Sequence, residues 1–368
     1  MSDESRREKT PPSWLLPTPA RRDERAGGPL REFTLRLMRG EDLRREEAAT
    51  LLDALLDGSA TDAQIGAALV ALAVKGETAE ELAGLASAMR RRAVRISARH
   101  ERFVDTAGTG SSAAKTFNVS TAAAFVIAGA GLPVAKHGSR AATSRSGSAD
   151  VLAALGVNVS AAPEVSESCL NELGVCFMFA PLYHGATARV AGVRRELGVH
   201  TTFNLLGPLT NPAGAPRQVI GVWHEALAEP LARTLLALGS ERAWVVHGLD
   251  GLDEVTLDGR TKVAEVADGA VRVFDVGPED FGLAPSGLEA LRGGGAEENA
   301  RVIRSILSGE RRDAGRALVV ANAAAALYVG GLAGDLLEAA RLAGRSIDSG
   351  AALEKLEGLA RASNAPEG

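Results

Sequence analysis

The sequence has little cysteine: its 368 residues include only two, Cys169 and Cys176. Two cysteines cannot supply a disulfide framework, and these two lack the C-x-x-C spacing and histidine partners that are typical of a zinc site. We therefore interpret both as small core residues of a protein in a reducing compartment, and we predict a cytoplasmic location.

A surplus of positive charge is also missing. The chain has 41 Lys and Arg against 46 Asp and Glu, a net charge of −5, so no broad basic field favours a nucleic-acid partner. No apolar run reaches the length of a membrane span, and we expect no membrane association. Residues 1–31 are rich in Arg, Glu, Pro and Ser without an apolar segment, which predicts a disordered tail and not a signal peptide.

Two common nucleotide-binding motifs are absent. The P-loop pattern G-x-x-x-x-G-K-[ST] does not occur. The glycine pair of Gly108-Thr109-Gly110 is followed by Ser111 and Ser112, so the G-x-G-x-x-G dinucleotide fingerprint is incomplete. The sequence therefore gives no support to a P-loop nucleotidase or a classical dinucleotide-binding enzyme.

Helical patterning dominates the first part of the chain, residues 32–98. Leucines 51, 52, 55 and 56 form one stripe at helical period, and Thr61 with Gln64 and Thr78 with Glu81 have capping-box spacing. These signals predict three short antiparallel helices. Because so small a bundle buries little apolar surface alone, we expect it to pack against a second copy as a homodimer.

The pattern changes after residue 98 to short apolar runs that alternate with helical stretches. The runs predicted as strands are 103–104, 133–135, 157–159, 175–179, 217–223, 242–247, 261–266 and 270–275. This alternation predicts an α/β domain with a mostly parallel sheet, made of residues 99–181 and 199–363. Residues 182–198 are predicted as one helix that folds back into the helical domain, and 202–212 as a rigid Gly/Pro loop.

The stretch from Asp105 to Asp150 holds the densest candidate chemistry. Two polar, glycine-containing loops flank one apolar helix that begins near Asn118. Glycines allow close approach of the backbone to a ligand, and a helix N-terminus favours phosphate. Positive side chains follow at Lys136, His137 and Arg140. A Gly-Thr-Gly turn with a hydroxyl cap is common by itself, but two such loops around one helix favour a site for a phosphorylated small molecule.

Three other segments allow both a functional and an ordinary interpretation. Asp253 and Glu254 follow the predicted strand 242–247 and suit a hard cation such as Mg2+, although the residues alone favour a polar turn. Arg194 suits a carboxylate ligand if it faces a cleft, yet most helical arginines are surface charges. The predicted loop 202–212 either connects two elements or lines a pocket.

Together these segments resemble anthranilate phosphoribosyltransferase, in order from about residue 32 to 360. The resemblance rests on residues 108–110 with 116–121, 136–138, 147–150, 204–212 and 250–254. It implies a homodimer with a small helical domain and a large α/β domain. It also implies Mg2+, two ions per subunit, with 5-phosphoribosyl 1-diphosphate and anthranilate as substrates.

The resemblance also assigns roles to individual residues. Residues implied to bind the phosphoribosyl diphosphate are Gly108, Thr109, Gly110, Ser111, Ser112, Thr116, Asn118, Ser120, Thr121, Lys136 and Ser148. Residues implied to bind anthranilate are Gly108, His137, Ser139, Arg194, Gly207 and Pro208. Metal ligands are implied to be Ser120, Asp253 and Glu254. Lys136 is expected to stabilise the leaving group, and no residue is expected to act as a covalent nucleophile.

Two departures from the usual family pattern matter for the site, and milder ones lie at Gly185 and Thr187. Ser111 and Ser112 replace a Gly-Asp pair, which removes a carboxylate beside the diphosphate, and Ser139 replaces an asparagine that contacts the acceptor. Two alternatives remain, and these changes keep the second of them open. One is an enzyme of the pyrimidine-nucleoside phosphorylase type, and the other is a non-catalytic paralogue that binds nucleic acid.

Overall fold

The computed structural model describes residues 28–110, 116–141 and 145–365, which form two compact units. The helical unit contains the chain up to Arg92 together with residues 186–206, and the α/β unit contains residues 93–185 and those from 207 onward. Each unit has its own buried core. The predicted fold class, a small helical domain with a larger α/β domain, is confirmed.

The helical unit begins earlier than the sequence suggested. Its helices are α1 (Gly28–Met38), α2 (Arg45–Leu56), α3 (Asp62–Lys75), α4 (Ala79–Arg92) and α9 (Ala188–Leu197). The predicted tail, residues 1–31, therefore overlaps α1, and the three-helix prediction missed this helix. Leu30, Phe33 and Leu37 of α1 are buried at helical spacing, and Pro29 stands in its first turn, a favoured place for proline.

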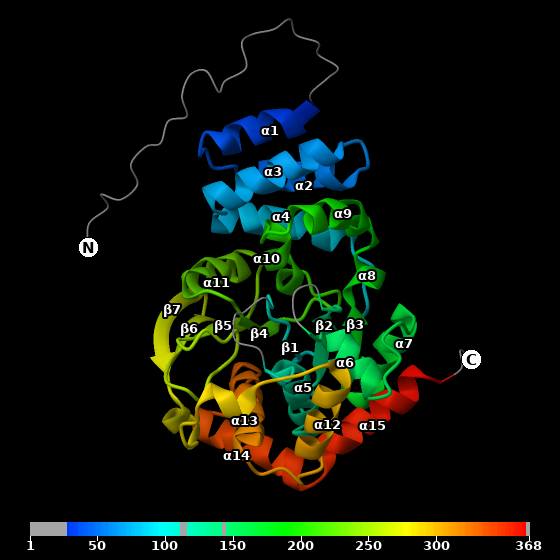
Figure 1. The fold of residues 1–368 in the computed structure, drawn as a ribbon, viewed down its shortest axis with the longest axis vertical. Coiled ribbons are helices and arrows are strands. Elements are labelled where there is room, and N and C mark those ends of the chain that lie inside the picture. The colour runs from blue at the N-terminus through cyan, green and yellow to red at the C-terminus, as the bar shows by residue number, and fades with distance from the viewer. Residues whose placement is uncertain (1–27, 111–115, 142–144, 366–368) are drawn as a thin grey trace, which may run out of the picture. The chain divides into compact units, whose positions relative to one another are not determined.

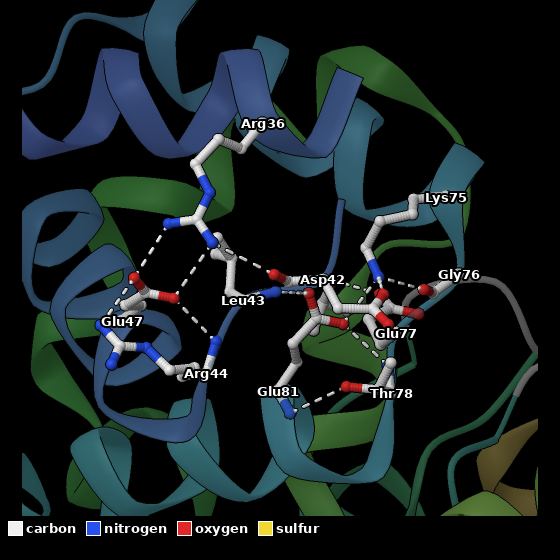
Figure 2. Close-up of polar contacts among 11 residues, drawn as sticks. Arg36, Asp42, Leu43, Arg44, Glu47, Lys75, Gly76, Glu77, Thr78 and Glu81 are labelled. Carbon is white, nitrogen blue, oxygen red and sulfur yellow. Dashed lines mark hydrogen bonds and ion pairs between the residues drawn. The ribbon is translucent and has the colours of Figure 1, made fainter. Parts of the chain in front are cut away.

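A buried ion pair joins α3 and α4 to the segment that precedes α2 (Figure 2). Lys75 Nζ at the end of α3 donates to Glu81 at 2.8 Å and to Asp42 at 2.7 Å. The fully buried Glu81 also accepts from the backbone N–H groups of Leu43 and Thr78, so the Thr78–Glu81 capping box is confirmed. Buried charges are retained at low cost only when they are paired in this way.

Replacing Lys75 with methionine is expected to destabilise the protein by about 3 kcal/mol or more, because Glu81 would remain buried without its cation. Arg91→Met provides the control, since Arg91 makes an exposed ion pair with Asp53 that contributes about 1 kcal/mol or less. Urea unfolding followed by circular dichroism measures both. Equal losses for the two variants would contradict the structural role of the buried pair.

The segment from residue 182 to 212 differs from its prediction in two ways. The single helix predicted over 182–198 is divided into α8 (Ala180–Tyr183), a 3-10 turn (Gly185–Thr187) and α9. The predicted loop 202–212 instead contains α10 (Thr202–Leu209), with Pro208 in its last turn. Leu205, Leu206 and Leu209 are buried, so their helical spacing outweighed the Gly-Pro signal.

Residues 199–206, which the sequence assigned to the α/β domain, lie in the helical unit. Side-chain hydrogen bonds explain this difference. Thr202 Oγ1 donates to the Glu77 carboxylate between α3 and α4, and Arg194 of α9 bonds to Thr201 and Asn204. These hydrogen bonds therefore tie residues 199–206 to the helical unit.

The α/β unit is built on one sheet with the order β3-β2-β1-β4-β5-β6-β7 in the described residues (Figure 1). The strands are β1 (Val104–Asp105), β2 (Val134–Gly138), β3 (Val175–Phe179), β4 (Arg217–Gly221), β5 (Arg242–Gly248), β6 (Thr261–Ala267) and β7 (Ala270–Val276). Strands β1 to β5 pair in parallel, whereas β6 pairs antiparallel with β5, and β7 pairs antiparallel with β6. The prediction of a mostly parallel sheet is confirmed. The carboxyl ends of the parallel strands therefore share one edge, where ligands bind in such sheets.

Eight helices in the described residues of the α/β unit pack on this sheet or on one another. They are α5 (Val119–Gly129), α6 (Ser148–Ala154), α7 (Pro163–Ser168) with a π-helical turn (Cys169–Leu173), α11 (Ala228–Ala237), α12 (Ala296–Leu307), α13 (Ala314–Val329), α14 (Leu336–Asp348) and α15 (Ala351–Ser363). Short 3-10 turns lie at Glu225–Leu227, Pro278–Phe281 and Leu288–Leu291. α13 packs against α5, α14, β4 and β5, and α11 packs against β5 and β6. Both cysteines are buried and unpaired in this core, as predicted.

The strand predicted at 157–159 is wrong. The Val157 N–H bonds to the Leu152 carbonyl at the end of α6, and the Asn158 N–H bonds to the Ser363 hydroxyl of α15. Val157 and Val159 are buried, so the apolar alternation reflects packing between helices and not strand pairing.

Candidate active site

Lys136 lies on β2 with its side chain buried at the carboxyl edge of the sheet. Its Nζ donates to the carbonyl and hydroxyl oxygens of Thr106 at 3.3 Å, and to Ser120 Oγ at 3.5 Å. Burial lowers the pKa of Lys136, while the carboxylates of Asp105 and Glu254 oppose that shift. The Lys136 amine therefore lies beside the first turn of α5.

The acidic turn after β5 reaches the same place. Glu254 Oε1 accepts from the Ser120 N–H at 3.3 Å. Burial raises the pKa of Glu254 to about 8, and the neighbouring Asp253 carboxylate adds to the rise. Because Ser120 bonds to both Lys136 and Glu254, the two predicted segments converge at one hydroxyl residue of α5.

The glycine loop after β1 lies against the same turn. Thr109 donates to the Gly221 carbonyl through its N–H at 2.8 Å and its hydroxyl at 3.0 Å. Gly221 in turn packs so closely that an added Cβ would lie 1.7 Å from the Asp253 carbonyl oxygen. Gly110 adopts a φ of 64°, which favours glycine. The loop therefore contacts the end of β4, and the end of β4 contacts the acidic turn.

Asn118 immediately precedes α5 and adopts the left-handed conformation with a φ of 63°. Its side chain donates to the Ser146 carbonyl at 3.1 Å and accepts from Asn299 at 2.9 Å. These two bonds hold a conformation that non-glycine residues rarely adopt. The N–H groups at the start of α5 are thereby fixed in direction.

Three further residues predicted to bind the phosphoribosyl diphosphate are Thr121, Thr116 and Ser148. Thr121 is buried in the first turn of α5, and its Oγ1 has no hydrogen-bond partner among the described residues. Thr116 pairs through its backbone with Arg292. Ser148 begins α6, and its hydroxyl donates to the Ser139 carbonyl at 3.3 Å, which brings the second predicted loop to the first helix turn of α6.

His137 is the neighbour of Lys136 on β2 and is buried. Its Nδ1 lies 3.2 Å from the Gly207 carbonyl, and its ring tilts against that of His184 with centroids 5.1 Å apart. Burial lowers the pKa of His137 to about 3, so the ring is neutral at physiological pH. Its Nε2 is buried and has no hydrogen-bond partner among the described residues.

The remaining residues predicted to bind a substrate lie in different surroundings. The Pro208 carbonyl accepts from Gln218 at 2.7 Å, which fixes the end of α10 beside β4. Ser139 is exposed, and its carbonyl accepts from Ala149 at the start of α6. Ser111 and Ser112 lie outside the described residues.

Arg194 belongs to the helical unit. It donates to Thr201 Oγ1 at 3.2 Å and to Asn204 Oδ1 at 3.4 Å, and its guanidinium lies 5.3 Å from the Phe203 ring centre. Burial lowers the pKa of Arg194. These three partners are neutral residues, so none of them offsets the charge of the guanidinium.

The acidic turn has the chemistry that a hard divalent cation requires. Asp253 and Glu254 are adjacent carboxylates, and burial together with the Asp253 charge raises the pKa of Glu254. Residues 28–110, 116–141 and 145–365 contain no group of three or more His, Cys, Asp or Glu placed to hold a metal. Two adjacent carboxylates suit Mg2+, whose other ligands are water and substrate oxygens.

Comparisons with known proteins agree with this arrangement. A model of the glycosyl transferase family a/b domain matches residues 100–353, and a model of the family's helical bundle domain matches residues 31–93. An anthranilate phosphoribosyltransferase from Anaeromyxobacter dehalogenans is 54% identical over 334 residues, which cover 90% of this chain and 98% of that protein. The chain belongs to the anthranilate phosphoribosyltransferase family.

Solved structures of the anthranilate phosphoribosyltransferase family share the fold. The protein from Thermus thermophilus is 42% identical with a TM-score of 0.85, covering 90% of this chain and 99% of that one. The Saccharomyces cerevisiae protein in complex with PRPP and Mg is 29% identical with a TM-score of 0.81, covering 91% and 97%. Neither of the two alternatives raised by the sequence is favoured by these relatives.

Several buried polar residues near the family motifs were not predicted. Asp105 at the end of β1 accepts from the Asn211 side chain at 2.7 Å and from the His137 N–H at 3.2 Å. Burial raises the pKa of Asp105, although the charge of Lys136 opposes this. A carboxylate at the end of a buried strand was the available signal for Asp105. Asn211 and Asn299 carry no comparable signal in the sequence.

No helix among the described residues is both long enough and apolar enough to span a membrane.

Proposed function

We propose that this protein transfers the 5-phosphoribosyl group of 5-phosphoribosyl 1-diphosphate (PRPP) to the amine of anthranilate, in tryptophan biosynthesis. The products are N-(5-phosphoribosyl)anthranilate and diphosphate. The observation that carries the proposal is the meeting of Lys136 and Glu254 at Ser120. Support comes also from the yeast family member, for which structures exist with PRPP and Mg and with 4-fluoroanthranilate.

Leaving-group stabilisation is the main task of this site, because negative charge builds on the diphosphate as the C1–O bond breaks. Lys136 Nζ, the N–H groups at the start of α5 and the hydroxyls of Thr109 and Ser120 supply positive or donor groups there. Bound Mg2+ would add charge neutralisation of the diphosphate. We assign Ser120 to one ion, and Asp253 with Glu254 to a second.

The acceptor needs orientation more than activation. The neutral amine of anthranilate is already a nucleophile, so the enzyme requires no strong base and no covalent intermediate. The neutral His137, whose Nε2 has no partner among the described residues, is suited to hold the amine by a hydrogen bond, with Gly207 and Pro208 beside it. Fixed placement of amine and C1 then accounts for much of the rate. We assign the carboxylate of anthranilate to Arg194.

The assembly and location are also proposals. The exposed Val70 and Val74 of α3 and Met38 of α1 support homodimerisation through the helical unit, because apolar side chains on a surface helix favour burial against a second copy. The two buried, unpaired cysteines support a reducing compartment, for which we propose the cytoplasm.

The direct test is to incubate the protein with PRPP, Mg2+ and anthranilate and to follow the loss of anthranilate fluorescence. We expect loss of fluorescence that requires all three components, with stoichiometric release of diphosphate. Phosphate-dependent cleavage of thymidine in place of this reaction would support the nucleoside phosphorylase alternative. No turnover of either substrate by the folded protein would favour the non-catalytic alternative.

Arg194→Ala is expected to raise the KM for anthranilate about tenfold or more while the KM for PRPP changes little. The reason is that a charge-assisted hydrogen bond contributes about 1.5–3 kcal/mol. The exposed neighbour Arg195 provides the control, because Arg195→Ala changes the same charge on the same helix. Steady-state kinetics with each substrate varied separately gives both constants. Equal increases in the two KM values for Arg194→Ala would refute the carboxylate assignment.

A further inference from the structure

A buried asparagine of α13 forms hydrogen bonds to the backbone directly after the acidic turn. Asn322 is 5% exposed and lies in the middle of α13, the long helix that packs on β4 and β5 (Figure 1). Its Oδ1 accepts from the Val255 N–H at 2.9 Å, and its Nδ2 donates to the Val255 carbonyl at 2.9 Å. The Nδ2 group also donates to the Leu318 carbonyl at 2.9 Å. The amide of Asn322 is therefore held in one orientation.

Val255 directly follows Glu254 and lies outside the strands. Both of its backbone groups bond to the one amide, so the peptide that leaves Glu254 is fixed in position and in direction. Other contacts hold the turn elsewhere: Asp250 accepts from the Leu252 N–H and the Thr256 hydroxyl, and Gly221 packs on the Asp253 carbonyl. The backbone directly after Glu254 is held by the side chain of Asn322.

We propose that Asn322 is a positioning residue for the cation-binding carboxylates, which acts by fixing the Val255 peptide and so the direction of Asp253 and Glu254. This inference rests on the proposed function, because it takes the acidic turn as the place where the cation binds. A divalent cation with near-octahedral geometry tolerates little displacement of its carboxylate ligands. Loss of such supporting hydrogen bonds commonly weakens metal binding by about 10- to 100-fold.

Asn322→Ala is expected to weaken the binding of Mn2+, measured by electron paramagnetic resonance in the presence of PRPP, by about tenfold or more. Turnover of this variant is expected to require correspondingly more Mg2+ and to recover at saturating Mg2+. The KM for anthranilate should change little, because the hydrogen-bond partners of Asn322 among the described residues are Val255 and Leu318. If Asn322→Ala does not fold, Asn322→Ser carries the test, since its short hydroxyl cannot reach both Val255 groups.

Ser346→Ala provides a matched control. Ser346 of α14 is also buried, and its hydroxyl donates to the Val126 carbonyl at 2.8 Å, away from the acidic turn. Its removal is expected to lower the melting temperature without changing Mn2+ binding. A purely structural role for Asn322 would give the same result as this control.

Glu254→Gln in the same Mn2+-binding assay tests the metal site separately from the role of Asn322. Weak Mn2+ binding by both Glu254→Gln and Asn322→Ala supports the inference. Weak binding by Glu254→Gln with unchanged binding by Asn322→Ala overturns the role of Asn322 and leaves the proposed function intact. Unchanged binding by Glu254→Gln removes the metal site itself, and the inference about Asn322 falls with it.

Discussion

Glu254→Gln is expected to lose at least about a hundredfold in turnover and, at the same time, to make the metal-free protein more stable above pH 8. The loss of turnover follows because the side chain no longer supplies a carboxylate for the cation beside the diphosphate. The gain in stability follows because burial raises the pKa of Glu254 to about 8. Few substitutions would change activity and stability in opposite directions so clearly.

The direction of the pH effect follows from proton binding. Between about pH 4.5 and pH 8, unfolded Glu254 loses its proton while folded Glu254 keeps it. The folded protein then binds more protons, so its stability falls as the pH rises through this window. The pKa rise limits this contribution to about 5 kcal/mol. The glutamine side chain does not ionise in this range, so this fall in stability with rising pH is absent from the variant.

Thermal unfolding in the presence of a chelator, repeated from pH 5 to pH 9, measures the effect. We expect the melting temperatures of the wild type and Glu254→Gln to separate as the pH rises. Glu279→Gln is the control, because Glu279 makes an exposed ion pair with Arg260. A separation that is constant with pH would contradict the buried, protonated state of Glu254.

Lys136→Met is expected to lower kcat by about 10²–10³ while the protein remains folded. The hydrogen-bond partners of Nζ among the described residues are the oxygens of Thr106 and Ser120. Methionine keeps the length of the side chain and removes its charge. We therefore expect a defect in the reaction of PRPP together with some loss of stability, because the buried Asp105 loses the opposing charge of Lys136.

Steady-state kinetics and circular dichroism together test this expectation. The KM for anthranilate should change little, because the charge of Lys136 is assigned to the leaving diphosphate. Lys262→Met is the control: Lys262 is a half-buried lysine of β6 that pairs with Glu225. A kcat close to that of the wild type in folded Lys136→Met would remove Lys136 from the leaving-group site.

Local sequence signals predicted much of the fold because they depend on neighbouring residues. The capping boxes at Thr61 and Thr78 formed as expected, and the apolar runs after residue 98 became strands of the sheet apart from 157–159. The errors arose where two local signals competed. Gly207-Pro208 indicated a loop, whereas the leucines of the same segment indicated the helix that formed.

The sequence predicted which residues form the candidate site but not which of them contact one another. The hydroxyls, the lysine and the acid pair were identified from their residue types and from the family resemblance. Their meeting at Ser120 joins positions up to 134 residues apart, and only the strand order decides such a meeting. Asn322 could not be identified from the sequence, since an asparagine in an alanine-rich helix shows nothing of its partner 67 residues away.

The most direct test of the central claim is a crystal structure of the protein with PRPP and Mn2+, with the metal located by its anomalous scattering. We predict a manganese peak roughly 2 Å from a carboxylate oxygen of Glu254 or Asp253, with Lys136 Nζ within hydrogen-bonding distance of a diphosphate oxygen. A diphosphate bound away from Lys136, or a metal bound away from both carboxylates, would contradict the account.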